Sequence, residues 1–590
     1  MKAEAAPGTG RALLAEAESR LLELSIEAQR TAWLYETFIN EDTEALTSKA
    51  DARVTLATVD FAKQVARLPA RDLSGDLERK ARLLRLSLAL LSPSDPQASE
   101  ELARLVASMR GRYAKGRYRP SGSETELDLN ALSRQLAESR DAEALRDIWT
   151  GWHAVGTPMR EEFARYVDLS NRGAREVGFA DTGAMWRSKY DMPAPQFTEE
   201  VERLWIQVRP LYRLLHAFVR SRLLKTYGPG VVDPQGPIPA HLFGNMWAQS
   251  WEYLYPMLAP AGAGRGYDLT EILANRKVDA RELVRIAERF FLSLGFEPLP
   301  ASFWERSMFV KPPDREVLCH ASAWDIDFED DLRIKMCIDV TEEEFFVVHH
   351  ELGHNFYQRA YKGQPFLYRD SANDGFHEAV GDTIGLSVTP EYLVRIGFLS
   401  QAPPAAGDTG LLLAKALEKV AFLPFGLLVD RWRWSVFSGE TPPARYNAAW
   451  WELRRRYQGV SAPIPRDESN FDPGAKAHIP SSTPYMRYFL AAILQFQFHR
   501  ALAQQAGWTG PLHRYSIYGD RQAGDRLKKM FEMGASCPWP EALEALTGSR
   551  SMDASAILDY FRPLQRWLEE QTRDVPVGWP GESAGPVPSS

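Results

Sequence analysis

The chain has 590 residues, of which 45% are hydrophobic and 25% are charged. This balance is typical of a folded globular protein, and it excludes a disordered, collagen-like or small disulfide-rich chain. Lys and Arg number 70 against 78 Asp and Glu, so the net charge is −8, which argues against a protein that binds nucleic acid through phosphate contacts.

The N-terminal part of the chain is expected to form long helices. Apolar residues recur there at helical spacing between charged ones: Leu14, Ala17, Leu21 and Leu24. A second helical stretch covers residues 77–91 and ends at a Ser-Pro stop signal. Strand signals are sparse, and the best are residues 307–310 and 332–338.

No segment reaches the roughly 20 apolar residues that a membrane-spanning helix needs. The longest candidate, residues 488–498, contains two Gln, and the first 30 residues lack the apolar core of a signal peptide. The sequence is therefore either that of a cytoplasmic protein or a processed form of an exported one.

We expect one large, mostly helical domain over residues 1–575, because the turn-rich breaks along the chain are short. Residues 576–590 are rich in Pro, Gly and Ser, which predicts a flexible tail. The chain has three cysteines, Cys319, Cys337 and Cys537, so at most one intramolecular disulfide can form, and three reduced thiols are the alternative. No C-x-x-C pair is present, which argues against a cysteine zinc site.

The strongest chemical signal lies where five of the 11 histidines fall between His320 and His377. Residues 350–354 read H-E-x-x-H inside a segment with helical character. His350 and His354 would share one face of the helix and could bind one metal ion, while Glu351 lies beside that face, where it could take a proton from an attacking water. The alternative is a helix with two ordinary histidines.

A second predicted helix begins at residues 373–375 and supplies carboxylates. Glu378 lies 24 residues after His354 and could be the third metal ligand. Asp382, one helical turn further, could accept the other N–H of a ligating histidine. Two His and one Glu leave a fourth position of a zinc ion open, which is typical of a catalytic site with one ion per chain.

These residues and further blocks resemble the angiotensin-converting enzyme family of zinc dipeptidyl carboxypeptidases. The resemblance runs from about residue 12 to about residue 580. Its blocks, in chain order, are WRSKY at Trp186, GPIPAHLFGNMWAQSW from Gly236, CHASAWD from Cys319, HHELGH, GFHEAVGD, AFLPFGLLVDRWRW from Ala421, AAWWELRRRYQG from Ala448 and HIPSSTPYMRYFLAAILQFQFH from His478. The resemblance implies an almost wholly α-helical ellipsoid of two lobes with a deep central channel, partly covered by N-terminal helices over residues 12–110.

The resemblance also assigns roles to individual residues. Zinc would be held by His350, His354 and Glu378, with Glu351 as general base and acid. Tyr488 would hydrogen-bond the oxyanion. The substrate main chain would be held by His320, Ala321, Ala323 and His478.

The C-terminal carboxylate of an oligopeptide substrate would be bound by Gln249, Lys476 and Tyr485, all of which are hydrogen-bond donors. A relative that removes single residues carries Arg where this chain has Gln249, so the resemblance favours release of a dipeptide. The alternatives are a single-residue zinc carboxypeptidase, a helical zinc oligopeptidase or a non-catalytic peptide-binding relative. Side-chain preference stays open, because Ala477, Ala492 and Glu344 depart from the residues that are usual in the family.

The family is chloride-sensitive, which makes chloride an expected activator. Arg187, Trp450 and Arg454 match one chloride site, and Tyr227 and Arg487 match a second. An anion is plausible beside a buried Arg that has no carboxylate partner.

Cys319 and Cys337 match a family disulfide, which implies an oxidising compartment. Cys537 has no counterpart, and Tyr515 replaces a cysteine of another family disulfide. No N-x-S/T glycosylation site is present. Together these features point to a secreted or periplasmic bacterial protein, while the missing leader keeps a cytoplasmic location open.

Overall fold

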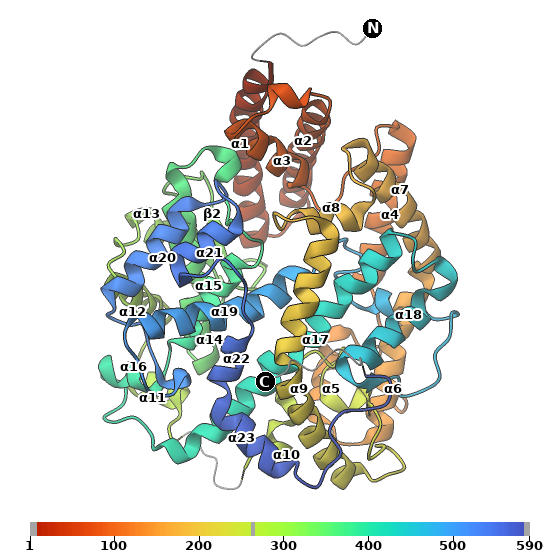
Figure 1. Ribbon diagram of the computed structural model, residues 1–590, viewed down its shortest axis with the longest axis vertical. Coiled ribbons are helices and arrows are strands. Elements are labelled where there is room, and N and C mark those ends of the chain that lie inside the picture. The colour runs from red at the N-terminus through yellow and green to blue at the C-terminus, as the bar shows by residue number, and fades with distance from the viewer. Residues whose placement is uncertain (1–8, 261–265, 583–590) are drawn as a thin grey trace.

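The computed structural model describes residues 9–260 and 266–582. Most of these residues lie in helices, which confirms the mostly α-helical prediction (Figure 1). The described strands form two small pairs: β1 (Ile238–Pro239) is parallel to β4 (Val460–Ser461), and β2 (Ser322–Asp325) is antiparallel to β3 (Leu332–Lys335). The predicted strand over residues 332–338 is therefore shorter, and the one over 307–310 is reduced to a bridge between Met308 and Lys335.

The N-terminal helices project from one end of the molecule, at the top of Figure 1. They are α1 (Thr9–Thr37), α2 (Glu41–Ala66) and α3 (Asp76–Leu86). Their apolar side chains form a small core of their own: Leu14, Ala17, Leu21, Phe61, Val65, Ala81 and Leu84. By contrast, α4 (Pro96–Ala114) packs on α7 (Arg160–Glu176) and its apolar face joins the main core, so the separately packed part is smaller than residues 12–110.

The second predicted helix, 77–91, is shorter in the structure because α3 ends at Leu86. The residues that follow α3 make contacts with distant segments of the chain. The carbonyl of Ala89 accepts a hydrogen bond of 2.7 Å from the indole of Trp186. Leu91 lies so close to α7 that a Cβ atom on Gly173 would be 1.8 Å from the Leu91 carbonyl oxygen. These contacts favour a non-helical segment over a further helical turn.

The other helices form two halves, seen at the right and left of Figure 1. The right half contains α4, α5 (Leu129–Glu138), α6 (Ala142–His153), α7, α8 (Thr182–Ser188) and α18 (Tyr446–Leu453). The left half contains α11 (Leu269–Asn275), α12 (Ala280–Ser293), α13 (Ala301–Arg306), α14 (Glu342–Ala360), α15 (Phe376–Leu386), α16 (Pro390–Arg395), α20 (Arg521–Met533) and α21 (Trp539–Thr547). The deep channel that the resemblance implies stays a prediction.

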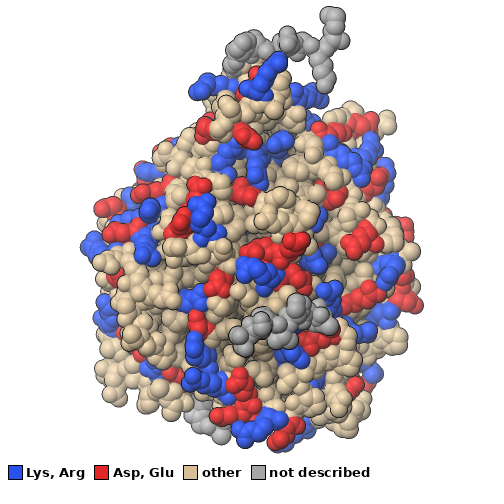
Figure 2. All heavy atoms as spheres, in the orientation of Figure 1, with Lys and Arg blue, Asp and Glu red and all other residues tan. Residues whose placement is uncertain are grey.

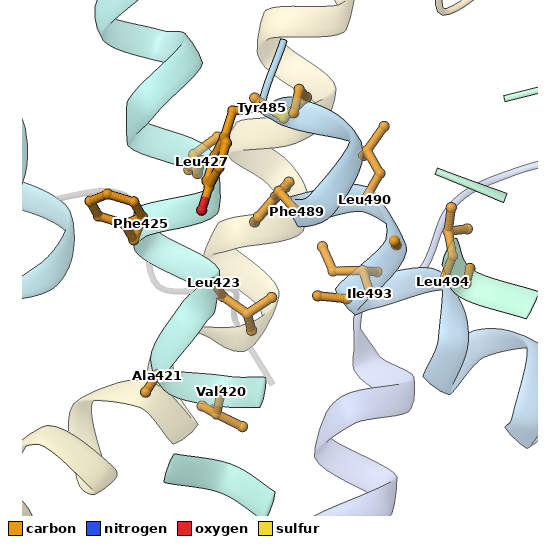
Figure 3. Close-up of a cluster of buried hydrophobic side chains, with 14 of the residues drawn as sticks. Val420, Ala421, Leu423, Phe425, Leu427, Tyr485, Phe489, Leu490, Ile493 and Leu494 are labelled. Carbon is orange, nitrogen blue, oxygen red and sulfur yellow. The ribbon is translucent and has the colours of Figure 1, made fainter. Parts of the chain in front are cut away.

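Three long helices join the halves: α9 (Ala194–Tyr227), α17 (Asp408–Phe437) and α19 (Met486–Gln505). The short helices α10 (Tyr255–Leu258), α22 (Ser555–Tyr560) and α23 (Arg562–Gln571) pack against them. Figure 3 shows the apolar contact between α17 and α19, in which Leu423 lies towards Phe489 and Ile493, while Leu427 lies further along α17. All four side chains are fully buried, so the contact excludes water and stabilises the junction.

The predicted flexible tail is wrong for residues 576–582, which pack on the body. The indole of Trp579 donates a hydrogen bond of 2.6 Å to the carbonyl of Arg455. The buried guanidinium of Arg220 donates to the carbonyl groups of Gly578, at 2.7 Å, and Pro576. A buried Arg needs such acceptors, so the segment is held in place. Residues 583–590 lie outside the described part.

The visible surface mixes Lys and Arg with Asp and Glu, as Figure 2 shows. Among the helices that the structure describes, none combines the length and apolar character needed to cross a lipid bilayer.

The close contact at Gly173 can be tested by substitution. We expect Gly173→Ala to lower the free energy of unfolding by about 1–3 kcal/mol, because the added methyl group would overlap a main-chain carbonyl. Gly111→Ala is the matched control, since this helical glycine in α4 has open space around it, and its stability should rise by up to about 1 kcal/mol. Denaturant unfolding of both variants measures the difference, and equal stabilities would contradict the packing described.

Candidate metal centre and active site

Helix α14 carries the H-E-x-x-H motif, as predicted. The hydroxyl of Thr341 caps its first turn by accepting from the Glu344 N–H, and three glutamates in that turn suit the positive end of the helix dipole. The helix packs against α12, α15, α20 and the β2–β3 hairpin. His350 and His354 are therefore placed by a helix that is held on several sides.

Helix α15 crosses α14 at close range through two glycines. It begins just after residues 373–375, where the Asn373 side chain accepts a hydrogen bond of 2.8 Å from the Gly375 N–H. A Cβ atom on Gly353 of α14 would lie 3.1 Å from the Cα atom of Gly381, and one on Gly381 would lie 2.7 Å from Nδ1 of His350. The absence of side chains at both positions lets the helices bring their polar groups together.

The crossing brings His350, His354 and Glu378 into one cluster, with one possible ligand atom of each lying within 4.8 Å of the others. The Nε2 atoms of the two histidines are 3.1 Å apart, and Nε2 of His350 is 3.6 Å from Oε2 of Glu378. Ligands about 2.0–2.1 Å from a tetrahedral zinc ion lie about 3.3 Å from one another. The three residues therefore fit one zinc ion in both donor type and spacing.

Asp382 lies behind His350, where the sequence predicted a supporting carboxylate. Its Oδ1 atom is 3.2 Å from Nδ1 of His350, and its Oδ2 atom accepts a hydrogen bond of 3.2 Å from the ammonium of Lys419. Burial alone would raise the pKa of Asp382, but Lys419 and His350 hold it well below its usual range. An ionised Asp382 can orient the ring so that Nε2 of His350 faces the metal position.

Glu351 points from α14 towards the β2 strand. Its carboxylate accepts a hydrogen bond from the main-chain N–H of Ala323, and burial raises its pKa above the ordinary value for Glu. A carboxylate with a raised pKa is suited to taking up and releasing a proton near neutral pH.

Aromatic rings of the segment 478–488 form another side of the site. The ring of His478 lies 4.7 Å from that of Tyr485 and 5.6 Å from that of Tyr488. Burial raises the pKa of Tyr488, and the nearby carboxylate of Glu378 adds to this effect. Burial also lowers the pKa of His478 to about 3, so its ring is neutral at neutral pH. These groups are uncharged hydrogen-bond partners close to the metal ligands.

On the side of the β2 strand, His320 is exposed and its Nδ1 atom lies 2.9 Å from the Ala321 carbonyl oxygen. Ala321 and Ala323 are partly exposed. Because Ala323 also contacts Glu351, this extended segment borders the carboxylate of the H-E-x-x-H motif.

The three residues predicted to bind a C-terminal carboxylate converge. The ammonium of Lys476 donates a hydrogen bond of 2.7 Å to Oε1 of Gln249, and the Tyr485 hydroxyl donates one of 3.3 Å to the same oxygen. Lys476 is almost fully buried and lies 4.1 Å from the ring centre of Trp247. No carboxylate among the described residues pairs with it, and burial lowers its pKa to about 7.

The predicted chloride residues are brought together only in part. Arg454 is fully buried, its Nε and Nη2 atoms have no hydrogen-bond partner among the described atoms, and burial lowers its pKa to about 9. Its main-chain N–H bonds to the Trp450 carbonyl, so these two residues are neighbours. Arg187 is not part of this group. It stacks on Trp434, which lies about 13 Å further along α17 than the ring of Phe425 beneath Arg454.

The pairing of Tyr227 with Arg487 is wrong. Tyr227 is the last residue of α9, which is about 50 Å long, whereas Arg487 lies beside Tyr190, just before the start of that helix. Arg487 instead forms an ion pair of 3.1 Å with Asp374, which also pairs with Lys189 at 3.0 Å. The pairing came from the family resemblance, and the length of α9 keeps Tyr227 away from Arg487.

The disulfide between Cys319 and Cys337 is present, with Cα atoms 5.1 Å apart, and Cys537 is a free thiol. Sequence reasoning did not single out Lys419, Trp247 or Gly381. Trp247 and Gly381 lie inside the quoted sequence blocks, two residues before Gln249 and one before Asp382, but their contacts depend on segments far away in the chain.

The sequence of this chain is similar to those of one peptidase family. Residues 7–579 match the peptidase M2 family, described as angiotensin-converting enzyme. The angiotensin-converting enzyme of Rattus norvegicus is 44% identical over 569 residues, which are 94% of this chain and 43% of the rat protein. That of Theromyzon tessulatum is 46% identical over 455 residues, which are 77% of this chain and 73% of the relative. The chain thus spans less than half the length of the rat protein. It belongs to the angiotensin-converting enzyme family.

Proposed function

We propose that this protein is a zinc metallopeptidase that releases dipeptides from the C-terminal end of oligopeptides. The observation that carries the proposal is the buried ammonium of Lys476, which has no carboxylate partner among the described residues and lies against Gln249 and Tyr485. Tyr485 in turn contacts His478 and Tyr488, and Tyr488 lies near the cluster of metal ligands. A carboxylate anchor and a metal cluster are thus connected through one group of side chains.

Zinc is the metal we propose for His350, His354 and Glu378, one ion per chain. When bound there, zinc polarises the carbonyl of the bond to be cleaved and makes water easier to deprotonate. Two histidines and one carboxylate are the ligand set of a catalytic zinc site.

The chain's own residues would then perform the proton transfers and hold the substrate. Glu351 takes the proton of the attacking water and passes it to the nitrogen of the departing amine. The Tyr488 hydroxyl donates a hydrogen bond to the oxygen that becomes negative. His478, His320 and the main chain of Ala321 and Ala323 hold the peptide in an extended form.

The anchor would decide where the peptide is cut. Lys476, Gln249 and Tyr485 can each donate to one terminal carboxylate, and the ammonium gains a counter-charge that it lacks in the free protein. A peptide with a free C-terminus is therefore preferred, and the distance from the anchor to Glu351 sets the number of residues released. Following the resemblance, Gln249 in place of Arg favours the release of two residues at a time.

We also propose a bound anion, with chloride as an activator, at Arg454 beside Trp450. Support comes from the buried guanidinium and its two unpartnered nitrogen atoms, since the nearest carboxylate, Asp472, is already bound by Arg466 and Trp451. The second predicted chloride site is different, because Asp374 already supplies a negative charge to Arg487.

A secreted or periplasmic location is our proposal for the cellular site. The Cys319–Cys337 disulfide supports it, because such bonds persist in oxidising compartments.

The activity can be tested with an N-blocked tripeptide that has a free C-terminus. We expect a C-terminal dipeptide among the products by mass spectrometry, loss of activity with a chelator, and recovery with zinc. A released single residue or internal cuts would instead indicate the carboxypeptidase or oligopeptidase alternative. Bound zinc without cleavage would indicate a peptide-binding protein.

Glu351→Gln is the matched variant for this assay. It should bind zinc as the wild type does and lower kcat by roughly 10²- to 10⁴-fold, because the amide cannot take up a proton. Full activity with stoichiometric zinc would exclude Glu351 as the base.

Lys476 should make substrate binding depend on pH. Only its ammonium form pairs with a carboxylate, and its pKa in the free protein is about 7, so KM should rise about tenfold per pH unit above that value. Lys476→Gln should raise KM on the order of 100-fold and remove this pH dependence. A tripeptide amide is the control substrate, since it should be poor for both proteins. A KM that is constant from about pH 6 to 9 in the wild type would contradict the assigned role.

Asp382 should affect zinc affinity without touching the ion. We expect Asp382→Asn to weaken zinc binding by roughly 10- to 100-fold, because His350 loses the carboxylate that orients it. Asp408→Asn is the control, since Asp408 is also a buried carboxylate but pairs with Arg514 and His513. Competition with a chelator measures both affinities, and equal values would argue against this role.

A further inference from the structure

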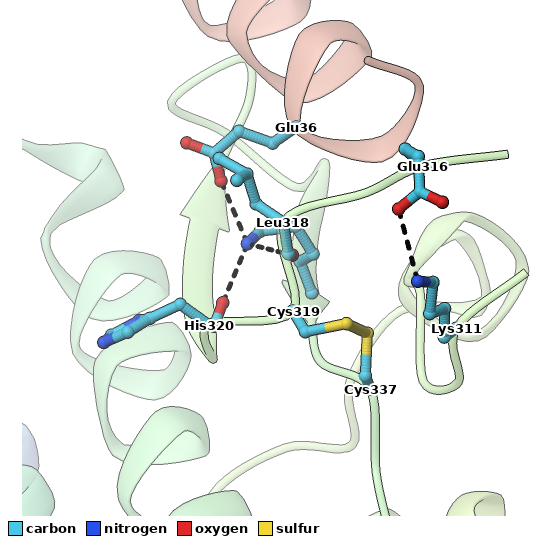
Figure 4. The surroundings of a disulfide bond; sticks show 8 residues. Glu36, Lys311, Glu316, Leu318, Cys319, His320 and Cys337 are labelled. Atoms are coloured by element: carbon cyan, nitrogen blue, oxygen red, sulfur yellow. Dashed lines mark hydrogen bonds and ion pairs between the residues drawn. A yellow bond between two sulfur atoms is a disulfide. The ribbon is translucent and has the colours of Figure 1, made fainter. Parts of the chain in front are cut away.

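Lys335 is a buried lysine outside the catalytic groups. It lies at the end of β3 and is 1% exposed. Its ammonium donates to the carbonyl oxygens of Leu318, at 2.8 Å, and His320, at 2.7 Å, and forms an ion pair of 3.0 Å with Glu36. An ammonium has three protons, so these three acceptors satisfy it completely. Figure 4 shows Glu36 and the carbonyl groups of Leu318 and His320 turned towards one point beside the disulfide.

Glu36 belongs to the last turn of α1, so this pair connects the N-terminal helices to the body. Main-chain groups make the same connection. The Leu318 N–H donates to the Glu36 carbonyl at 2.9 Å, and the Ile39 N–H donates to the Glu316 carbonyl at 3.0 Å. The end of α1 is therefore bonded directly to the segment that leads into β2.

The same segment leads into the proposed peptide-binding residues. Cys319 lies between Leu318 and His320 and is bonded to Cys337, two residues after Lys335. The disulfide therefore links the segment that accepts the hydrogen bonds to the segment that carries the ammonium. His320 comes next, and Ala323 contacts the catalytic carboxylate of Glu351. A shift of the Leu318 and His320 carbonyl groups would move the segment that faces the substrate.

We propose that Lys335 is a positioning residue that couples the N-terminal helices to the peptide-binding segment 320–323. The proposal rests on the proposed peptidase function. When α1 moves away from the body, the buried ammonium loses its only carboxylate partner among the described residues, and the two carbonyl groups alone must compensate its charge. Peptide binding and the docked position of α1 therefore favour each other, as linked equilibria require.

Glu36→Gln tests this coupling with little change of shape. We expect KM for the tripeptide to rise roughly tenfold, the size of one charge-assisted hydrogen bond, with kcat and zinc content nearly unchanged. Glu36→Asp keeps the carboxylate and should recover part of the loss. Glu27→Gln is the matched control, because Glu27 also lies on α1 and pairs with Arg53 of α2, but does not reach the body. Its KM should equal that of the wild type.

Hydrogen exchange provides a readout that does not depend on catalysis. The amides of residues 318–323 should exchange faster in Glu36→Gln than in the wild type or in Glu27→Gln. Unchanged exchange together with unchanged KM would overturn the coupling. Loss of kcat and zinc together with KM would overturn it too, since the residue would then be needed only for folding. If the wild type cleaves no peptide, the proposed function fails, while the exchange experiment still decides the coupling.

Discussion

The close crossing of α14 and α15 is the contact on which the whole site depends. Gly353 and Gly381 leave no side chains between the helices, so the rings of His350 and His354 reach Glu378. The same crossing places Asp382 behind His350, and Lys419 of α17 balances the charge of that carboxylate. Burying several charged groups together is costly unless each has a partner, and here Glu378 faces an imidazole while Asp382 faces an imidazole and an ammonium. A metal ion bound by His350, His354 and Glu378 would complete this balance of charges.

The proposed carboxylate anchor has the opposite charge balance. Lys476 is buried without a carboxylate, and the face of Trp247 and the oxygen of Gln249 compensate its charge only partly. A group that is under-compensated in the free protein gains more from an incoming carboxylate than an exposed lysine would gain. If Lys476 binds a peptide C-terminus as we propose, part of the binding energy comes from this incomplete compensation, and a chain interior or a blocked end would not gain it.

The metal-ligand cluster and the Lys476 group lie close together because the helices α17 and α19 hold the halves of the molecule together. α17 carries Lys419, while Tyr488 lies in the first turn of α19. Helix α19 also packs directly on α15, which carries Glu378, so Tyr488 is held close to the candidate metal ligands. The N-terminal helices are attached by more polar contacts, at Lys335 and at Arg79, and by a small apolar core on which Phe366 and Leu367 of the body also pack. Polar contacts that close over a site can open without unfolding the main core.

Features that depend on local spacing were predictable from the sequence. The period of a helix places His350 and His354 on one face, and Asp382 one turn from Glu378, whatever surrounds them. The disulfide and the anchor residues followed from the family resemblance, which carries information about tertiary contacts that spacing lacks.

Tertiary structure alone decided the rest. The contacts of Ala89 and Leu91 ended α3 early, Arg220 held residues 576–582, and the length of α9 separated Tyr227 from Arg487. Lys335 and Lys419 gave no signal in the sequence, because a lysine is usually exposed and only its distant partners make it a buried link.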